Sequence, residues 1–143
     1  DETREALRDG WLHTGDIGTL DEDGYLYVLD RKKDVIVSGG ENVYPRTVEE
    51  VLLQHPAVAD AAVIGVPDER WGEAVKAIVV LRAGMTVSER ELLDFCRERL
   101  AGFQRPRSVD FVEALPRNPS GKVLKRVLRE PYWAGHWRRV AGA

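Results

Sequence analysis

The sequence predicts an α+β domain in which helices flank a central sheet of about three strands, with a short β-hairpin in front. Two long apolar runs, at residues 58–66 and 74–81, have the composition of strands, and residues 109–112 alternate in polarity as a third strand does. Between these runs lie segments with helical periodicity. With 143 residues and 43% hydrophobic content, the chain can bury one modest core.

Residues 21–37 are predicted to contain a hairpin turn and two short strands. Residues 21–24 (Asp-Glu-Asp-Gly) are typical of a hairpin turn, and the aromatic and branched residues 25–29 favour a strand after it. A short apolar strand at residues 35–37 follows and ends at Gly39 and Gly40, where glycine supplies backbone freedom.

Three helices are predicted. Pro45 suits the first turn of a helix that runs to about His55. Ser88 with Glu91 forms a capping box that opens a second helix, and residues 121–130 are predicted as a third. The apolar face of the first helix consists of Val48, Val51 and Leu52. That of the second helix consists of Leu92, Leu93, Phe95, Cys96 and Leu100.

Composition narrows the function classes. A single cysteine, Cys96, excludes an internal disulfide and a multi-cysteine metal site, so no metal site is predicted. The net charge of −3 and the lack of a nucleic-acid motif argue against nucleic-acid binding. No apolar run is long enough for a membrane span and no signal segment is evident, so a cytoplasmic location is expected.

Charge is distributed unevenly along the chain. Residues 1–30 carry nine acidic and two basic side chains, whereas residues 117–139 carry seven basic and one acidic. The basic residues of this C-terminal segment could bind an anionic ligand such as a nucleotide or CoA. Lys125, Arg126 and Arg129 are interpreted as a solvated helix face.

Residues 116–122 (Pro-Arg-Asn-Pro-Ser-Gly-Lys) place one lysine in a loop of restricted backbone freedom. A cation held at a fixed position can stabilise charge that develops on anionic oxygens in a transition state. Lys122 is therefore a candidate catalytic residue for phosphoryl or adenylyl transfer.

Upstream segments agree with this interpretation. Residues 11–16 read Trp-Leu-His-Thr-Gly-Asp, residues 30–36 read Asp-Arg-Lys-Lys-Asp-Val-Ile, and residues 38–45 read Ser-Gly-Gly-Glu-Asn-Val-Tyr-Pro. In this order and spacing, and with the lysine loop, the chain resembles the C-terminal part of AMP-forming acyl-CoA synthetases. The same superfamily holds peptide-synthetase adenylation domains and luciferases.

The resemblance implies a division of the chain. Residues 1–30 would be the end of a large N-terminal adenylating domain, residues 30–34 a hinge centred on Lys33, and residues 35–143 a mobile C-terminal domain. The mobile domain would present the lysine loop for adenylation and the Gly39-Gly40 loop for thioesterification. By itself the 143-residue chain is expected to be inactive.

Site roles also follow from the resemblance. Lys122 would bridge the substrate carboxylate and the α-phosphate, while Asp16 and Arg31 would bind the ribose of ATP. The residues expected around the pantetheine thiol are Gly39, Gly40, Glu41 and Asn42, and of these Gly40 and Glu41 are expected to be catalytic. The residues expected to line the CoA nucleotide are Trp71, Phe103 and Arg105. Packing of Trp71 on its own domain stays open.

The function implied is that of an ATP-dependent carboxylic acid:CoA ligase, with a fatty acid as the expected substrate. ATP, CoA and the N-terminal domain would be the partners, and Mg²⁺ would be held mainly by that N-terminal domain. Two alternatives stay open, namely an adenylating enzyme that loads a carrier protein and a non-catalytic interaction module of the same fold.

Overall fold

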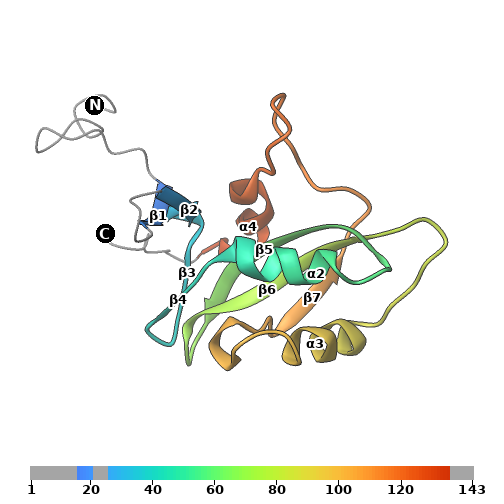
Figure 1. The fold of residues 1–143 in the computed structure, drawn as a ribbon, viewed down its shortest axis with the longest axis horizontal. Coiled ribbons are helices and arrows are strands. Elements are labelled where there is room, and N and C mark those ends of the chain that lie inside the picture. Colours follow the sequence, from blue (N-terminus) through green and yellow to red (C-terminus); the bar gives the residue numbers. More distant parts are fainter. Residues whose placement is uncertain (1–15, 21–25, 136–143) are drawn as a thin grey trace, which may run out of the picture.

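The computed structural model describes residues 16–20 and 26–135. Its first element is an antiparallel hairpin of β1 (Asp16–Leu20) and β2 (Leu26–Arg31), which confirms the hairpin predicted around residues 21–24. One 3-10 turn, η2 (Lys32–Asp34), then leads from the hairpin into the main sheet (Figure 1).

The main sheet has five strands, so the α+β prediction is confirmed but the expected number of about three strands is too low. The strands are β3 (Ile36–Ser38), β4 (Glu41–Val43), β5 (Val58–Asp68), β6 (Gly72–Leu81) and β7 (Ser108–Phe111). Their order is β4-β3-β6-β5, and β7 pairs with β6 in parallel while the other pairs are antiparallel. β4 was not predicted because Glu41 and Asn42 are exposed polar residues that produce no apolar pattern.

The two long strands bury side chains on both faces of the sheet. Along β5, Ala61 and Val63 join one apolar cluster, and Ala62 and Ile64 join another. Because successive side chains of a strand point to opposite faces of the sheet, these two pairs lie on opposite faces. A strand that is apolar on both faces is typical of a sheet covered on both sides.

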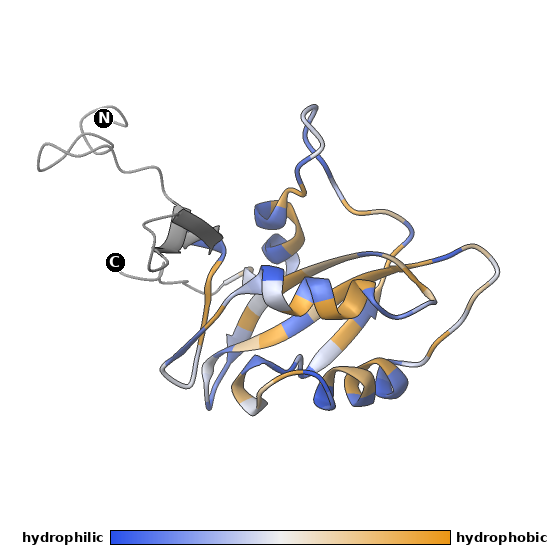
Figure 2. Cartoon of the chain, viewed as in Figure 1, coloured by the Kyte–Doolittle hydropathy of each residue, from blue (hydrophilic) through white to orange (hydrophobic). Residues whose placement is uncertain are grey.

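Helices supply that cover. α2 (Pro45–Leu53) and α3 (Glu89–Arg97) pack on one face around the larger cluster, which contains Leu52 and Leu92. α4 (Lys125–Trp133) packs on the other face around the smaller one. The helices carry hydrophobic residues on one side and hydrophilic residues on the other (Figure 2). The predicted cap of α3 is confirmed, since Ser88 Oγ accepts a hydrogen bond from the Glu91 N–H at 3.1 Å.

The start of α4 differs from the prediction. The helix begins at Lys125 rather than at Gly121, because the residues before it form a β-hairpin instead. Arg117 and Val123 make an antiparallel bridge in this hairpin. Backbone pairing thus takes the hydrogen-bonding groups that an earlier helical turn would need.

A polar network fastens α4 to the sheet. Lys76 on β6 is almost fully buried and its Nζ lies 3.4 Å from the Asp110 carboxylate, to which the Tyr132 hydroxyl also donates. Burial and the hydrogen bond to Asp110 raise the pKa of Tyr132 to about 12. Trp133 Nε1 donates to the carbonyl of Gly65 at 2.8 Å. The end of α4 is therefore fixed by directed bonds as well as by apolar packing.

Cys96 belongs to the core. It is fully buried in α3, and burial raises the pKa of its thiol to about 11. The thiol therefore stays protonated at neutral pH, which makes it unsuited to act as a nucleophile.

Candidate functional site

Lys122 lies in a tight β-hairpin that joins β7 to α4. The Leu124 N–H donates to the Pro116 carbonyl at 2.8 Å and closes the base of the hairpin. At the tip, the Gly121 N–H donates to the Asn118 carbonyl at 2.9 Å, and Gly121 has a positive φ of 88°. These bonds make a defined β-turn, so the predicted restriction of this loop has a structural basis.

Asn118 forms hydrogen bonds with both the backbone carbonyl and the backbone N–H of Lys122. Its N–H donates to the Lys122 carbonyl at 2.9 Å, and its Oδ1 accepts from the Lys122 N–H at 2.9 Å. Ser120 Oγ donates to the same Oδ1 at 2.7 Å. Among the described residues, the exposed amine of Lys122 has no ion-pair or hydrogen-bond partner. Its backbone is thus fixed while its charge is left available to a ligand.

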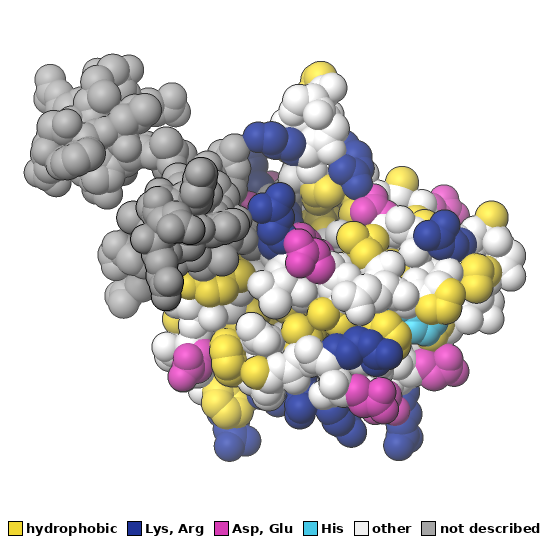
Figure 3. Space-filling view, viewed as in Figure 1, with side chains coloured by type: hydrophobic (Ala, Val, Ile, Leu, Met, Phe, Trp, Pro, Cys, Tyr) yellow, Lys and Arg dark blue, Asp and Glu magenta, His cyan; other side chains and the backbone are white. Residues whose placement is uncertain are grey.

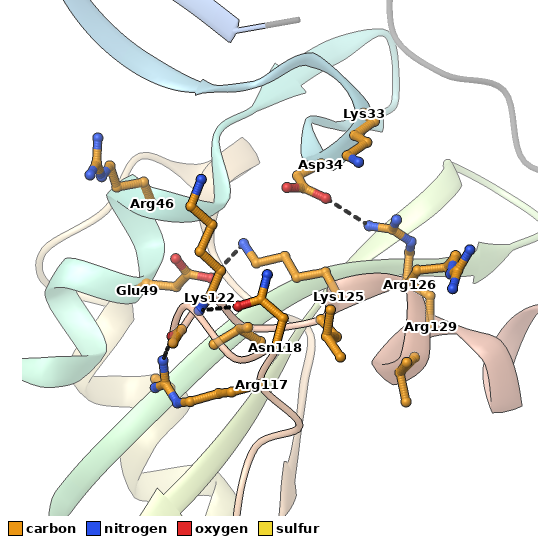
Figure 4. A pocket seen from close by; sticks show the side chains of 15 residues that line it. Lys33, Asp34, Arg46, Glu49, Arg117, Asn118, Lys122, Lys125, Arg126 and Arg129 are labelled. Atoms are coloured by element: carbon orange, nitrogen blue, oxygen red, sulfur yellow. Dashed lines mark hydrogen bonds and ion pairs between the residues drawn. The ribbon is translucent and has the colours of Figure 1, made fainter. Parts of the chain in front are cut away.

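An open cavity of about 690 Å³ lies beside this hairpin, and Figure 4 shows the side chains that surround it. Seven of its lining residues are basic and two are acidic: Lys33, Arg46, Arg117, Lys122, Lys125, Arg126 and Arg129, with Asp34 and Glu49. Lys and Arg side chains also gather around the projecting hairpin in the space-filling view (Figure 3). This excess of positive charge favours an anionic ligand.

Two ion pairs order one wall of the cavity. Lys125 Nζ lies 2.7 Å from Glu49 Oε2 of α2, and Arg129 Nη1 lies 3.3 Å from Asp34 Oδ1 of η2. The four side chains are only 12–19% exposed. The interpretation of Lys125 and Arg129 as solvated is therefore wrong, because contacts far along the chain, which periodicity does not reveal, bring each of them to a carboxylate.

A second candidate region is the Gly39-Gly40 turn between β3 and β4. The pairing of Ser38 with Glu41 leaves two residues in the turn, and both have positive φ, 59° and 84°. This is the conformation of a type I′ hairpin turn, for which glycine is preferred. The Gly39 N–H donates to the Trp71 carbonyl at 2.9 Å, so the turn is fixed against the β5–β6 connection.

Gly39 also has no room for a side chain. A Cβ atom there would lie 2.6 Å from Cε3 of Trp71. We expect Gly39→Ala to lower the free energy of unfolding by roughly 1–3 kcal/mol more than Gly84→Ala. Gly84 is a matched control, since it has a similar φ of 76° but nothing within 4 Å of an added Cβ. Equal midpoints in urea for the two variants would contradict the close packing of Trp71.

Trp71 packs on its own domain, as one of the two interpretations anticipated. Its half-buried ring lies against Gly39, and the guanidinium groups of Arg70 and Arg107 lie 4.8 and 5.2 Å from the ring centroid. Neither arginine was predicted as a site residue. Arg107 is brought to Trp71 by the pairing of β7 with β6, which the sequence does not reveal.

The other two residues predicted to line a CoA nucleotide lie nearby. Phe103 is 44% exposed in η3 (Gly102–Gln104), and η3 contacts β4 next to the glycine turn. Arg105 Nε donates to the Leu100 carbonyl at 3.0 Å, so one of its donors serves the end of α3. Trp71 and Phe103 thus belong to the same end of the domain as the glycine turn, with Arg107 as the added cation.

The two candidate regions point in different directions. In Figure 1 the Lys122 hairpin projects at the top, whereas the β3–β4 turn projects at the lower left. Glu41 and Asn42 are exposed beside that turn. Asp16 lies opposite Arg31 in the pairing of β1 with β2, although the side chains of both lie outside the described part of the structure. Lys122 and the glycine turn therefore lie apart in the structure. Asp16 and Arg31, the two residues predicted to bind the ribose, lie opposite each other in the β1–β2 pair.

Comparison with known proteins identifies this arrangement. The family described as AMP-binding enzyme C-terminal domain matches residues 47–122, which is more than half of the chain. The chain belongs to this AMP-binding enzyme C-terminal domain family. The matched range includes α2 except its first two residues, the three strands β5, β6 and β7, helix α3, and the hairpin as far as Lys122.

Relatives of this AMP-binding C-terminal domain are ligases. The 2-succinylbenzoate–CoA ligase of Bacillus cereus is 56% identical over 130 residues, which are 91% of this chain and 27% of that protein. The fatty acid–[acyl-carrier-protein] ligase ScoC of Streptomyces coeruleorubidus is 52% identical over 98% of this chain and 27% of that protein. The ATP-bound structure of MatB from Rhodopseudomonas palustris matches with a TM-score of 0.86 and 44% identity, over 92% of this chain and 26% of MatB.

The chain therefore spans about a quarter of the length of the relatives it matches. Within the residues that the structure describes, no helix has both the length and the apolar character of a membrane span.

Proposed function

We propose that this chain is the C-terminal domain of an AMP-forming carboxylic acid:CoA ligase that works by domain alternation. The observation that supports this most directly is Lys122, whose backbone is fixed by Asn118 while its amine is available to a ligand. The names of the similar proteins, which include a CoA ligase and an acyl-carrier-protein ligase, agree with this reaction class.

In the first half-reaction, a carboxylate oxygen of the acid attacks the α-phosphorus of ATP and pyrophosphate leaves. Lys122 would contact both the carboxylate and an α-phosphate oxygen, and so hold the reacting atoms together. Its charge would also stabilise the negative charge on the oxygens of the α-phosphoryl group in the transition state. The basic cavity around Lys122 suits such an anionic partner.

In the second half-reaction, the pantetheine thiolate attacks the acyl carbonyl and AMP leaves. The Gly39-Gly40 turn would let the pantetheine pass close to the backbone, with Glu41 and Asn42 beside it. Trp71 and Phe103 would contact the adenine of CoA, and Arg105 with Arg107 its phosphates.

We assign residues 1–30 to the end of the N-terminal adenylating domain, residues 30–34 to the hinge and residues 35–143 to the mobile domain. η2 places Lys33 between the hairpin that carries Asp16 and Arg31 and the five-stranded sheet. A backbone rotation at Lys33 would turn the mobile domain relative to the N-terminal domain. The glycine turn would then replace the lysine hairpin at the single active site. The N-terminal domain would hold most of the Mg²⁺ ligands and the acid pocket, and we place the ligase in the cytoplasm.

A fatty acid is our proposed substrate, in line with the similarity to ScoC, which is named a fatty acid ligase. The same relative favours a second candidate acceptor, an acyl-carrier protein in place of CoA. In that case the surface around Trp71 and Arg105, with Arg107 beside Trp71, would contact the carrier.

The full-length parent should be assayed with ATP and a panel of acids that includes fatty acids and 2-succinylbenzoate. We expect pyrophosphate release, then AMP and a thioester when CoA is added. Thioester formation only with a carrier protein would favour the second acceptor. No pyrophosphate above the buffer rate with any acid would support the non-catalytic module instead. The 143-residue chain alone is the control and should release none.

A further inference from the structure

The guanidinium of Arg117 joins the Lys122 hairpin to the central sheet. Its Nη1 donates to the carbonyl of Gly121, the residue before Lys122, at 2.6 Å (Figure 4). Its Nη2 makes an ion pair with Asp60 on β5, which lies 57 residues away in sequence. One planar group therefore contacts the tip of the hairpin on one side and a strand on the other.

Asp60 is itself well oriented. Its Oδ1 accepts a hydrogen bond from the Ala61 N–H at 2.9 Å, while its Oδ2 faces Arg117. The residue is part of β5, which pairs with β6 from Val58 to Asp68. β5 is an edge strand of the sheet, and its register with β6 shifts between Val58 and Asp60. Its side chains nevertheless pack into apolar clusters on both faces, so the carboxylate is carried by a well-packed strand and offers a fixed point for the hairpin.

Asn118 and Asp60 have different tasks in this arrangement. The bonds that Asn118 makes with Ser120, Gly121 and Lys122 all lie within the hairpin, so they fix its shape but not its direction. The pair of Arg117 with Asp60 reaches the sheet and so sets the direction. The two side chains are 43% and 32% exposed, and such exposed ion pairs add little to stability. Their main effect is expected on geometry.

We propose that Asp60 is a positioning residue for Lys122. Acting through Arg117 and the Gly121 carbonyl, it sets the direction from which the Lys122 amine enters the adenylation site. Because a small displacement of a reacting group can cost a large factor in rate, loss of this link should slow adenylation. The inference rests on the proposed function, since it assigns Lys122 to the first half-reaction.

The test uses Asp60→Asn in the full-length parent. The amide keeps an oxygen for the Ala61 N–H but turns an NH2 group toward the guanidinium of Arg117. We expect single-turnover adenylation to fall on the order of tenfold. Conversion of a synthetic acyl-adenylate to the thioester should stay within about twofold of the unmodified enzyme, because Lys122 takes no part in that step.

Arg117→Lys is a second variant, and it should show the same selective loss. A lysine keeps the charge near Asp60 but cannot reach both partners with one planar group. Asp94→Asn is the matched control, since it removes the same charge from an exposed ion pair with Arg97 on α3. This control should leave both half-reactions unchanged.

A double variant distinguishes positioning from general damage. In a Lys122→Ala background, Asp60→Asn should cause no further loss of adenylation, because the group that it positions is gone. The same loss in both backgrounds, or no loss in either, would overturn the inference. If Lys122→Ala itself leaves adenylation unchanged, the proposed function fails, and that result is distinct from a failure of Asp60 alone.

Discussion

Replacing Lys122 by alanine in the full-length parent is expected to reduce adenylation by on the order of 10²-fold or more, the scale of losing one oriented electrostatic group. The amine is exposed, and its backbone is held by Asn118, so removing the side chain leaves the hairpin intact. Conversion of a supplied acyl-adenylate to the CoA thioester should stay nearly normal. Pyrophosphate release and thioester formation, measured separately, check both statements.

Arg90→Ala serves as the control for this variant, because it also removes one exposed charge but from α3, away from the cavity. It should leave both half-reactions unchanged. Equal losses in the two half-reactions for Lys122→Ala would contradict the assignment and would point to one fixed site or to general destabilisation.

Lys33→Pro should produce the opposite pattern. Proline fixes φ near −65°, a value within the range of a 3-10 turn such as η2. The backbone rotation required of a hinge would be hindered, which should slow the step after adenylate formation. We expect adenylation to be nearly normal and thioesterification from acid, ATP and CoA to fall on the order of tenfold or more.

Lys33→Ala separates the backbone effect from the loss of the side chain. It removes the same amine but leaves φ free, so it should retain most of the thioesterification rate. If Lys33→Ala and Lys33→Pro were equally slow, the side chain rather than hinge rotation would be responsible.

Local signals predicted much of the fold. Pro45 marks the start of α2, and Ser88 caps α3 through a bond to a residue three positions on. Both signals act within one helical turn, so the sequence displays them directly. The start of α4 could not be predicted in this way, because the partner of Val123 in the bridge is Arg117, on the other side of a turn.

The candidate site shows the same limit. Lys122 and the Gly39-Gly40 turn stand out because proline and glycine mark restricted or unusual backbone. Asp60, Arg70 and Arg107 gave no such signal. Asp60 reaches the lysine hairpin, and Arg107 reaches Trp71, only after β5, β6 and β7 have paired in the observed register.

The unequal packing of the two faces has a consequence for local opening. The cluster beneath α4 is the smaller one, and it is supplemented by the polar pairing of Tyr132 with Asp110. Segments with less buried apolar surface open at a lower free energy than the whole domain. Amide protons of α4 should therefore exchange with solvent sooner than those of α2 or β6, as hydrogen-exchange mass spectrometry can measure. Lys122 lies in the hairpin directly before α4, so in the proposed mechanism denaturant would abolish adenylation while most of the sheet stays folded.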